Sequence, residues 1–515
     1  MGKEEIINQE KVELSSNAYE VVKKRYLRCD ENGQPLETPD EMLYRVAEFM
    51  AQADKNYDSE VDLEKVISEF YLTLARSQFL PGGRVLFESG RTHTGQLASC
   101  FVVPIEDSLQ GIFDSLKNAA YIQKNNGGTG FNFSKIRPKG DVVNGATGVA
   151  AGPIHYIKTF DAALSSILQG SKRHGGNMGI LNVNHPDILS FIRLKDSSEG
   201  IKNFNTSVGV TNEFMEKVRR DEEFDLINPR NDESMGTLRA RELFNEITQR
   251  AWECADPGVV FMDALEKDNT TPGLGKLEAT NPCGEQPLLP YESCNLGSII
   301  MPTHVKNGEI DWDMLRGTVK TVIHFMDNMI DMNNYPLPEI EENVKKTRKI
   351  GLGVLGFAHV LYKLGIPYNS DKAVKVAEKI MKFIKEEGWE ASRNLAEIRG
   401  SFPGVDKSIF KDEERQPRNA TITTIAPNGT ISMVANTSSG VEPVFSLVTK
   451  RQVFFEDTKN ANGGRTLIFI DPLFEKVAKE EGFYSESLME RVAEEGSLKN
   501  IDEIPEKIKS FCNGS

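Results

Sequence analysis

Residues 281–285 read Asn-Pro-Cys-Gly-Glu, and residues 292–298 read Glu-Ser-Cys-Asn-Leu-Gly-Ser. Because a proline and a glycine flank Cys283, this segment is predicted to be a loop rather than a helix or a central strand. In an extended loop tip, the carboxylate of Glu285 and the amide of Asn281 would share the side of Cys283. The segment then offers a sulfur, a general base and an amide that can orient a hydroxyl group. The alternative is a buried structural cysteine in a turn.

Two further cysteines lie in comparable surroundings. Cys294 is part of the second stretch, and Cys100 lies in a predicted strand, Ser-Cys-Phe-Val-Val-Pro, at residues 99–104. Each of them alone could be a cysteine packed in the core. Three cysteines among serine, asparagine and glycine residues indicate another possibility, in which two form a redox pair and one is a separate reactive sulfur.

Working outward, residues 424–432 read Thr-Ile-Ala-Pro-Asn-Gly-Thr-Ile-Ser. A strand-like run ends at residues 427–429, and small hydroxyl residues follow. If a helix begins there, its free backbone N–H groups and these hydroxyls could hold an anion. An ordinary junction of strand, turn and helix is the alternative.

Two glycine-rich segments could also approach a ligand. Residues 124–130 read Lys-Asn-Asn-Gly-Gly-Thr-Gly, and consecutive glycines allow close approach of the backbone. Residues 169–178 form a basic loop bordered by glycines, which could contact a phosphate or a base. A solvated loop is the alternative for both segments.

Residues 351–356 match the pattern Gly-x-Gly-x-x-Gly of dinucleotide-binding sites, with Asp371 following. The preceding residues 345–349, Lys-Lys-Thr-Arg-Lys, are a poor start for a buried strand of that kind. We therefore interpret residues 351–356 as a strand packed against the following helix rather than as a dinucleotide site.

The order of predicted elements indicates an α/β fold. Thr38-Pro39-Asp40-Glu41 is a capping box with proline at the first helical position, and apolar residues then recur at helical spacing. From about residue 78, short apolar runs alternate with long helical patterns, which favours parallel strands. We predict a helical N-terminal domain at residues 1–77 and a larger α/β domain at residues 78–515.

The composition excludes several classes of protein. The chain has 515 residues, of which 39% are hydrophobic, with 76 acidic and 61 basic residues and a net charge of -15. This charge argues against nucleic-acid and anionic-membrane binding. An apolar run long enough for a membrane span and a signal sequence are both missing, so we expect a cytoplasmic protein. The six cysteines and seven histidines show no metal-ligand spacing, so no protein-ligated metal is expected.

Taken together, these motifs resemble those of the catalytic subunit of ribonucleotide reductase. The order of the stretches at 99–104, 281–285, 292–298 and 424–432 is characteristic of that family. Residues 137–153 and 169–192 are most similar to its adenosylcobalamin-dependent class II members. The resemblance implies a ten-stranded α/β barrel of two antiparallel halves with a central finger loop, as in glycyl-radical enzymes, after a helical N-terminal domain. It also implies that the last strands and a C-terminal cysteine pair would lie beyond residue 515.

The resemblance assigns roles in the reduction of ribonucleotides to 2′-deoxyribonucleotides for DNA synthesis. Cys283 would be the thiyl radical that removes the 3′ hydrogen, Glu285 would take the 3′-hydroxyl proton, and Asn281 would bind the ribose hydroxyls. Cys100 and Cys294 would supply the electrons and end as a disulfide.

The resemblance also implies binding residues. Substrate phosphates would lie on Ala426, Pro427, Asn428, Gly429, Thr430, Ile431 and Ser432, with Ser99 and Gly128 lining the same site. A deoxynucleoside triphosphate effector would bind between subunits at Asp107, Ser108 and Arg137, and Arg173 would relay its identity to the substrate base. The chain departs from the family pattern at Asn428, where threonine is usual, and at Asn126, where glycine is usual.

The implied cofactor is adenosylcobalamin, and the implied partners are a thioredoxin-like or glutaredoxin-like reductant and a second copy of the chain. Two alternatives stay open. The chain could be a class I-type subunit that needs a separate radical-generating subunit, or a nucleotide-binding chain that is inactive without a complementing polypeptide. The sequence does not distinguish diphosphate from triphosphate substrates.

Overall fold

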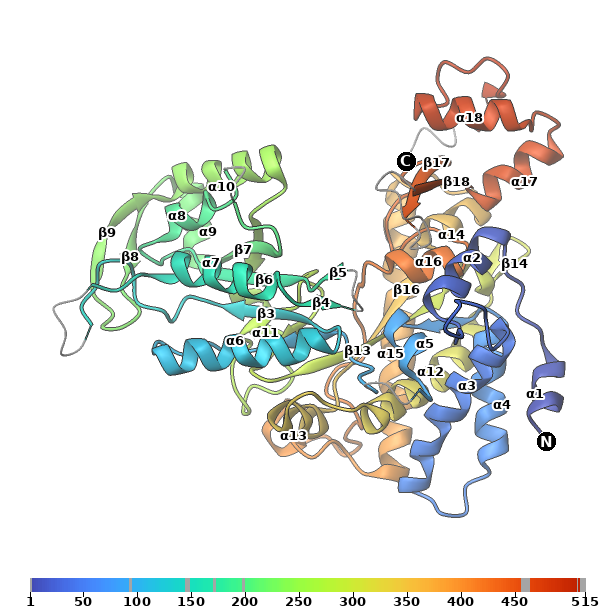
Figure 1. Ribbon diagram of the computed structural model, residues 1–515, viewed down its shortest axis with the longest axis horizontal. Coiled ribbons are helices and arrows are strands. Elements are labelled where there is room, and N and C mark those ends of the chain that lie inside the picture. Colours follow the sequence, from blue (N-terminus) through green and yellow to red (C-terminus); the bar gives the residue numbers. More distant parts are fainter. Residues whose placement is uncertain are drawn as a thin grey trace.

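The computed structural model describes residues 2–91, 95–143, 149–169, 173–196, 200–454, 464–506 and 508–509. Its N-terminal part is helical, in blue at the right of Figure 1. The elements are α1 (Lys3–Gln9), α2 (Ser16–Arg25), α3 (Pro39–Ala51), η1 (Gln52–Asn56), α4 (Leu63–Ala75) and α5 (Gly83–Glu88). The capping box that begins α3 is confirmed, since Thr38 Oγ1 accepts a hydrogen bond from Glu41 N and a Glu41 carboxylate oxygen accepts one from Thr38 N.

The main sheet carries the rest of the fold. Its strands are β1 (Phe79–Pro81), β2 (Cys100–Val102), β3 (Gly128–Asn132), β6 (Asn177–Asn182), β7 (Phe204–Val210), β10 (Gly258–Phe261), β13 (Ser293–Ile300) and β16 (Ile350–Leu355). Strands β2, β3, β6, β7 and β10 are parallel neighbours in that order. Strand β13 is antiparallel to β1 and β2 and parallel to β16.

Two groups of parallel strands therefore meet in an antiparallel contact between β2 and β13. Within the described residues the main sheet has 8 strands. A single parallel bridge between Leu352 and Thr423 continues the second group beyond β16. The sheet is an α/β half-barrel in which the two groups of strands run in opposite directions, as the resemblance implied. In the part of the chain that the structure describes, it has fewer strands than the ten of the implied barrel.

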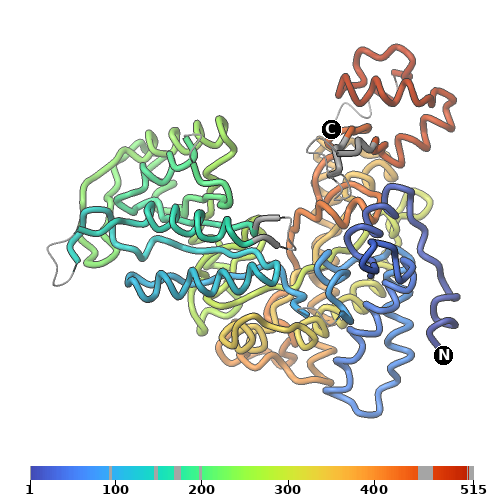
Figure 2. The backbone as a smooth tube through the Cα atoms, viewed as in Figure 1, coloured from blue at the N-terminus to red at the C-terminus, as the bar shows by residue number. Residues whose placement is uncertain are grey.

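Helices and short hairpins surround this sheet, giving the two lobes of Figure 2. The longer helices are α6 (Leu109–Lys124), α7 (Pro153–Leu164), α9 (Asn212–Arg220), α10 (Ala240–Cys254), α12 (Trp312–Met332), α13 (Pro338–Thr347) and α15 (Asp371–Arg399). The shorter ones are α8 (Ile188–Ile192), α11 (Met262–Lys267), η2 (Met301–His304), α14 (Phe357–Lys363), η3 (Val405–Lys407) and α16 (Gly429–Val434). The hairpin strands are β4 (Leu168–Gln169), β5 (Arg173–His174), β8 (Glu223–Ile227), β9 (Ser234–Arg239), β11 (Ala279–Thr280), β12 (Pro287–Leu288), β14 (Val305–Lys306) and β15 (Glu309–Ile310).

The C-terminal segment packs around a smaller core of its own. It contains β17 (Val448–Phe454), β18 (Gly464–Ile470), α17 (Pro472–Glu480) and α18 (Glu486–Glu495), drawn in red in Figure 1. Buried side chains such as Leu447, Phe474 and Met489 form that core. The N-terminal helices, in contrast, share one continuous hydrophobic core with the sheet and with α12.

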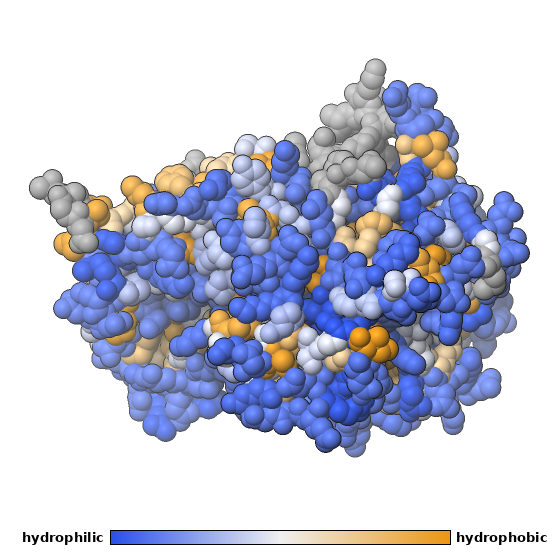
Figure 3. Space-filling view, turned by 90° about the horizontal axis from the view of Figure 1, so that it is seen from below, coloured by the Kyte–Doolittle hydropathy of each residue, from blue (hydrophilic) through white to orange (hydrophobic). Residues whose placement is uncertain are grey.

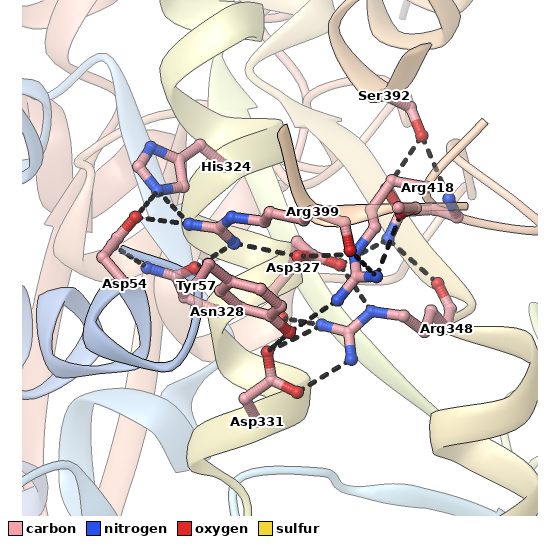
Figure 4. Close-up of polar contacts among 12 residues, drawn as sticks. Asp54, Tyr57, His324, Asp327, Asn328, Asp331, Arg348, Ser392, Arg399 and Arg418 are labelled. Atoms are coloured by element: carbon pink, nitrogen blue, oxygen red, sulfur yellow. Dashed lines mark hydrogen bonds and ion pairs between the residues drawn. The ribbon is translucent and has the colours of Figure 1, made fainter. Parts of the chain in front are cut away.

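Asp327 of α12 is the centre of a buried polar cluster that joins distant segments (Figure 4). Its carboxylate accepts hydrogen bonds from Arg348 Nε at 2.8 Å, Arg399 at 3.0 Å and Arg418 Nε at 3.3 Å. Arg399 also pairs with Asp54 of η1. The cluster therefore ties the N-terminal helices to the segments before β16 and before the strand-like residues 421–424.

The glycine pattern at residues 351–356 is a buried strand followed directly by a helix, as predicted. Strand β16 is buried along its whole length, Gly356 has φ +79°, and α14 follows. The face shown in Figure 3 is mostly hydrophilic, with hydrophobic residues in small separate groups. Within the described ranges, none of the helices combines the length and the apolar character needed to cross a bilayer.

Candidate active site

Cys283 lies at the tip of a hairpin loop, as predicted. Strands β11 and β12 pair antiparallel, and Asn281 N donates to Gln286 O at 3.2 Å. Within the loop, Gly284 N donates to Asn281 O at 3.0 Å, and Gly284 has φ +87°, a conformation that favours glycine. The turn leaves Cys283 exposed at the tip. We call residues 279–288 the finger hairpin.

Glycines of β3 make room for the finger hairpin. A Cβ atom at Gly130 would lie 1.7 Å from Thr280 O, and one at Gly128 would lie 2.8 Å from Pro282 Cγ. The base of the hairpin packs in a small apolar cluster with β2, β6 and β13, to which Ala279 and Leu288 contribute. The glycines of residues 124–130 were expected to allow close approach of the backbone to a ligand. At Gly128 and Gly130 it is the finger hairpin that approaches closely.

Cys100 and Cys294 lie directly opposite each other on β2 and β13. Opposed residues of an antiparallel pair have Cα atoms about 4.5–5.5 Å apart. That separation is within the range that a disulfide can span. Both cysteines are buried free thiols, with exposed fractions of 6% for Cys100 and 0% for Cys294. The two sulfurs are thus placed to form a redox pair.

The finger hairpin reaches this pair through Asn281 and Glu285. Asn281 Nδ2 donates to Cys100 Sγ at 3.2 Å, and its Oδ1 accepts from Gln286 N at 2.9 Å. Cys100 Sγ lies 4.0 Å from Glu285 Oε1 and 3.7 Å from Ser99 Oγ. Four of the predicted site residues, Ser99, Cys100, Asn281 and Glu285, therefore form one contact group beside Cys283.

Burial changes the acid–base properties of this group. Burial raises the pKa of Glu285, and the side chain of Asn281 offsets only part of the effect. Burial also raises the pKa of the Cys100 thiol, with a further contribution from the Glu285 carboxylate. The pKa of Cys294 is raised by burial and by the neighbouring Cys100. The pair is therefore held as thiols at neutral pH, which is the form that carries hydrogen atoms and protons.

The segment 424–432 joins the site from the other half of the sheet. Thr424 Oγ1 donates to Glu285 O at 3.1 Å, and α16 begins at Gly429. Arg25 of α2 donates to Thr430 Oγ1 at 3.3 Å. The predicted binding residues 426–432 thus come just after Thr424, which contacts the finger hairpin.

Both departures from the family pattern fall at backbone positions with positive φ. Asn428 has φ +56° and Asn126 has φ +65°, a region that asparagine tolerates better than most side chains. Asn428 also donates to Val354 O at 3.2 Å and Ala426 O at 3.0 Å, and it accepts from Ser298 Oγ at 3.1 Å. Its side chain therefore holds the turn before α16.

Two known protein-family models match most of the chain. The family described as "Ribonucleotide reductase, barrel domain" matches residues 98–512, and "Ribonucleotide reductase, all-alpha domain" matches residues 12–94. The chain belongs to the ribonucleotide reductase family. It is 42% identical to the vitamin B12-dependent ribonucleoside-diphosphate reductase of Thermoplasma acidophilum, over 97% of this chain and 71% of that protein.

Two other relatives show the breadth of the reductase family. The vitamin B12-dependent ribonucleoside-diphosphate reductase of Mycobacterium tuberculosis (strain CDC 1551 / Oshkosh) is 41% identical, over 98% of this chain and 71% of that protein. The ribonucleoside-diphosphate reductase large subunit of Vaccinia virus is 28% identical, over 95% of this chain and 68% of that protein. The identity is thus higher to these B12-dependent reductases than to this viral large subunit.

The residues that the reductase resemblance assigned to the effector are partly brought together. Arg137 Nε donates to Asp107 Oδ2 at 2.8 Å, and Ser108 caps α6 by accepting from Gly111 N at 3.0 Å. Arg173 lies in the short strand β5. Residues 144–148 and 170–172, which belong to the two predicted specificity loops, lie outside the described residues.

Two charged residues beside Cys294 were not singled out from the sequence. Glu292 and Lys349 form a buried ion pair with a distance of 2.6 Å. Lys349 belongs to the basic run 345–349, which was interpreted only as a poor strand. A lysine directly before a fully buried strand was the available signal, because a buried ammonium needs a carboxylate partner.

Proposed function

We propose that this chain reduces ribonucleoside diphosphates to 2′-deoxyribonucleoside diphosphates by thiyl-radical chemistry. The observation that carries the proposal is the opposed pair Cys100 and Cys294 beside the loop that presents Cys283. The names of the relatives at 41–42% identity support the diphosphate substrate. The comparisons favour neither a nucleotide-binding chain without catalysis nor a class I-type subunit, because the identity to the B12-dependent reductases is higher than that to the viral large subunit.

The residues of the finger hairpin begin the reaction. Cys283, as a thiyl radical, takes the 3′ hydrogen atom from the ribose. Glu285 takes the proton of the 3′-hydroxyl, and its proximity to Asn281 and Cys100 places it where a proton acceptor is needed. Asn281 orients the ribose hydroxyls.

The cysteine pair supplies two electrons and two hydrogens. A proton from one thiol of the Cys100–Cys294 pair leaves with the 2′-hydroxyl as water. The sugar radical is reduced at C2′ as a disulfide forms between the two sulfurs. Glu285 returns its proton to the 3′ oxygen, and Cys283 returns the 3′ hydrogen atom. The balance is one ribonucleotide and one dithiol giving one deoxyribonucleotide, one disulfide and one water. An external dithiol then restores the pair.

The cofactor proposed from the names of the relatives is adenosylcobalamin. The tip of the finger hairpin fits such a group, because Cys283 is exposed and a Cβ atom at Gly284 would meet nothing within 4 Å. When bound, adenosylcobalamin supplies one-electron chemistry that removes a hydrogen atom from a thiol. Cys283 and the backbone of Gly284 would face it there.

The nucleotide sites follow from the same family pattern. Residues 426–432 would hold the substrate phosphates, with Ser99 and Gly128 beside them, and the Thr424 contact to Glu285 supports this position. Asp107, Ser108 and Arg137 would bind a deoxynucleoside triphosphate effector, with Arg173 on the loop between the two sites. Linkage requires effector and substrate to tighten each other's binding by the same factor.

The cellular setting is also part of the proposal. A thioredoxin-like or glutaredoxin-like protein would be the reductant, the chain would act as a homodimer, and the reducing cytoplasm would be its compartment. Cys29, Cys100, Cys254 and Cys294 are free thiols in the structure, which fits such a compartment. We place the boundary between the helical and the barrel domain after residue 77.

Anaerobic turnover tests the proposed function. The purified chain is supplied with a ribonucleoside diphosphate, adenosylcobalamin and dithiothreitol, and deoxyribonucleotide is measured by chromatography. We expect turnover in the wild type, no turnover in Cys283→Ala with nucleotide affinity retained, and wild-type turnover in Cys254→Ala, whose thiol is exposed elsewhere. Turnover by Cys283→Ala, or activity only with an added radical-generating subunit, would overturn it.

A further inference from the structure

Lys349 lies beside Cys294, on the side away from Cys100. Strands β13 and β16 are parallel, with Asn295 opposite Ile350. The residues that precede these two, Cys294 and Lys349, continue the same register. Cys294 is therefore flanked by Cys100 on β2 and by Lys349 next to β16. In-register neighbours on adjacent strands share a face of the sheet.

The ammonium group of Lys349 is held by a built set of partners. Glu292 lies two residues before Cys294, and its carboxylate is 2.6 Å from Lys349 Nζ. That carboxylate also accepts hydrogen bonds from Thr347 Oγ1 and Leu289 N, each at 2.8 Å. Glu292 and Lys349 are both almost completely buried. The pair is thus fixed in position and shielded from solvent. The charges of Lys349 and Glu292 are therefore weakly screened at Cys294.

The charges around Cys294 act in opposite directions. Burial and the neighbouring Cys100 raise the pKa of Cys294, and the Glu285 and Glu292 carboxylates act in the same direction. The Lys349 ammonium lowers the pKa of Cys294, and its effect exceeds that of either carboxylate. Lys349 therefore supplies the charge that favours a thiolate at Cys294.

Cys100 has a different setting. Its sulfur contacts Ser99, Asn281 and Glu285, which line the proposed substrate site. The Cys294 sulfur contacts the backbone oxygen of Asn295 at 3.5 Å and is fully buried. A reductant that enters through the substrate site would therefore meet Cys100 first.

We propose that Lys349 is a positioning residue for the reduction of the Cys100–Cys294 disulfide, which makes Cys100 the sulfur attacked and Cys294 the leaving thiolate. This inference rests on the proposed role of the two cysteines. A thiolate of an external dithiol attacks Cys100 Sγ, a mixed disulfide forms there, and the bond to Cys294 Sγ breaks. The electron pair of that bond remains on Cys294 beside the ammonium group. The second thiol of the reductant then attacks the mixed disulfide, closing its own disulfide and releasing Cys100, which takes up a proton.

Charge variants test the role of Lys349. The variants are Lys349→Met, Lys349→Arg, and the double variant Lys349→Met/Glu292→Gln, which leaves no unpaired buried carboxylate. The rate of reduction of the oxidised pair by dithiothreitol is measured by the release of thiols. Since a leaving thiol of higher pKa leaves more slowly, we expect the double variant to be about tenfold slower and Lys349→Arg to be close to wild type. A double variant that is reduced at the wild-type rate would overturn the proposal.

A second measurement separates this proposal from the proposed function. Pre-reduced enzyme without external dithiol needs no disulfide exchange for its first turnover. We expect the double variant to form its first deoxyribonucleotide at the wild-type rate but to be slow under continuous turnover. A slow first turnover would place Lys349 in the radical steps and contradict the proposal. Failure of wild-type enzyme to form any product would instead reject the proposed function.

Trapping of the mixed disulfide tests which sulfur is attacked. The oxidised protein is first alkylated to block its other thiols, then treated with 2-mercaptoethanol and a second, isotopically labelled alkylating agent. Peptide mass spectrometry locates both labels. We expect mercaptoethanol on Cys100 and the second alkyl group on Cys294. The reverse distribution would refute the assigned direction.

Discussion

Glu285 combines the features of a proton acceptor with an unusual environment for a carboxylate. It contacts the Cys100 sulfur through Oε1, and its Oε2 is buried without a hydrogen-bond partner among the described residues. Burial raises its pKa above the ordinary value of 4.5. A carboxylate held ready in this way can take a proton from a hydroxyl group that enters the site.

The first prediction concerns this residue. Glu285→Gln should lower kcat by about 100-fold to 10,000-fold, because a positioned general base contributes that much. A base must be deprotonated to act, so the wild-type kcat/KM should fall as the pH drops through the raised pKa of Glu285. That decline should be missing in the variant. Turnover measured across a pH series checks both expectations.

Glu278→Gln is the matched control, since Glu278 lies just before the same hairpin and burial also raises its pKa, but its carboxylate pairs with Lys135. Glu278→Gln should keep a nearly wild-type kcat, and its kcat/KM should still fall as the pH drops. Equal losses in the two variants would contradict the role of Glu285.

At the scale of elements, the finger hairpin depends on the glycines of β3. Gly130→Ala should lower kcat by about 100-fold, because the added methyl would overlap the backbone of Thr280 and displace the hairpin by the order of 1 Å. Circular dichroism and nucleotide binding should show a folded protein. Steady-state turnover of the purified variant is the measurement.

Gly317→Ala is the control for the added methyl. Gly317 lies in α12, and a Cβ atom there would meet nothing within 4 Å. This variant should be fully active and about 1 kcal/mol more stable, because alanine favours a helix over glycine. Full activity of Gly130→Ala would show that the hairpin does not need the close approach.

At the scale of the whole molecule, Asp327 holds together segments that are far apart in the sequence. Burial alone would raise the pKa of Asp327, but Arg348, Arg418 and Arg399 outweigh it and hold the pKa well below its ordinary value of 3.8. Asp327→Asn should lower the free energy of unfolding by about 3–5 kcal/mol, because it leaves buried guanidinium groups without their shared carboxylate. Urea titration measures the change.

The pH dependence of this effect has a definite sign. A carboxyl group with a lowered pKa in the folded state stabilises the fold above its unfolded pKa and loses that contribution as the pH falls. The difference between wild type and Asp327→Asn should therefore shrink below about pH 4. Asp313→Asn, at an exposed ion pair on the same helix, should change stability by less than about 1 kcal/mol. A similar small change in Asp327→Asn would show that the cluster does not hold the domains.

Local pattern predicted individual elements accurately where a chemical rule applies within a few residues. The capping box at Thr38, the turn around Cys283 and the junction of β16 with α14 all follow from rules of this kind. The sequence alone did not show what approaches Gly128 and Gly130. The approaching residues are Pro282 and Thr280, which are distant in the sequence.

The order of the motifs, and the spacing inside each, determined from sequence alone the family, the α/β fold and the three cysteines. These depend on short-range chemistry and on a characteristic linear arrangement. Only the tertiary structure decided that Cys100 is opposite Cys294, that Glu285 reaches Cys100, and that Lys349 lies beside Cys294. Strand register and burial set those contacts, and both arise from the packing of segments that are far apart along the chain.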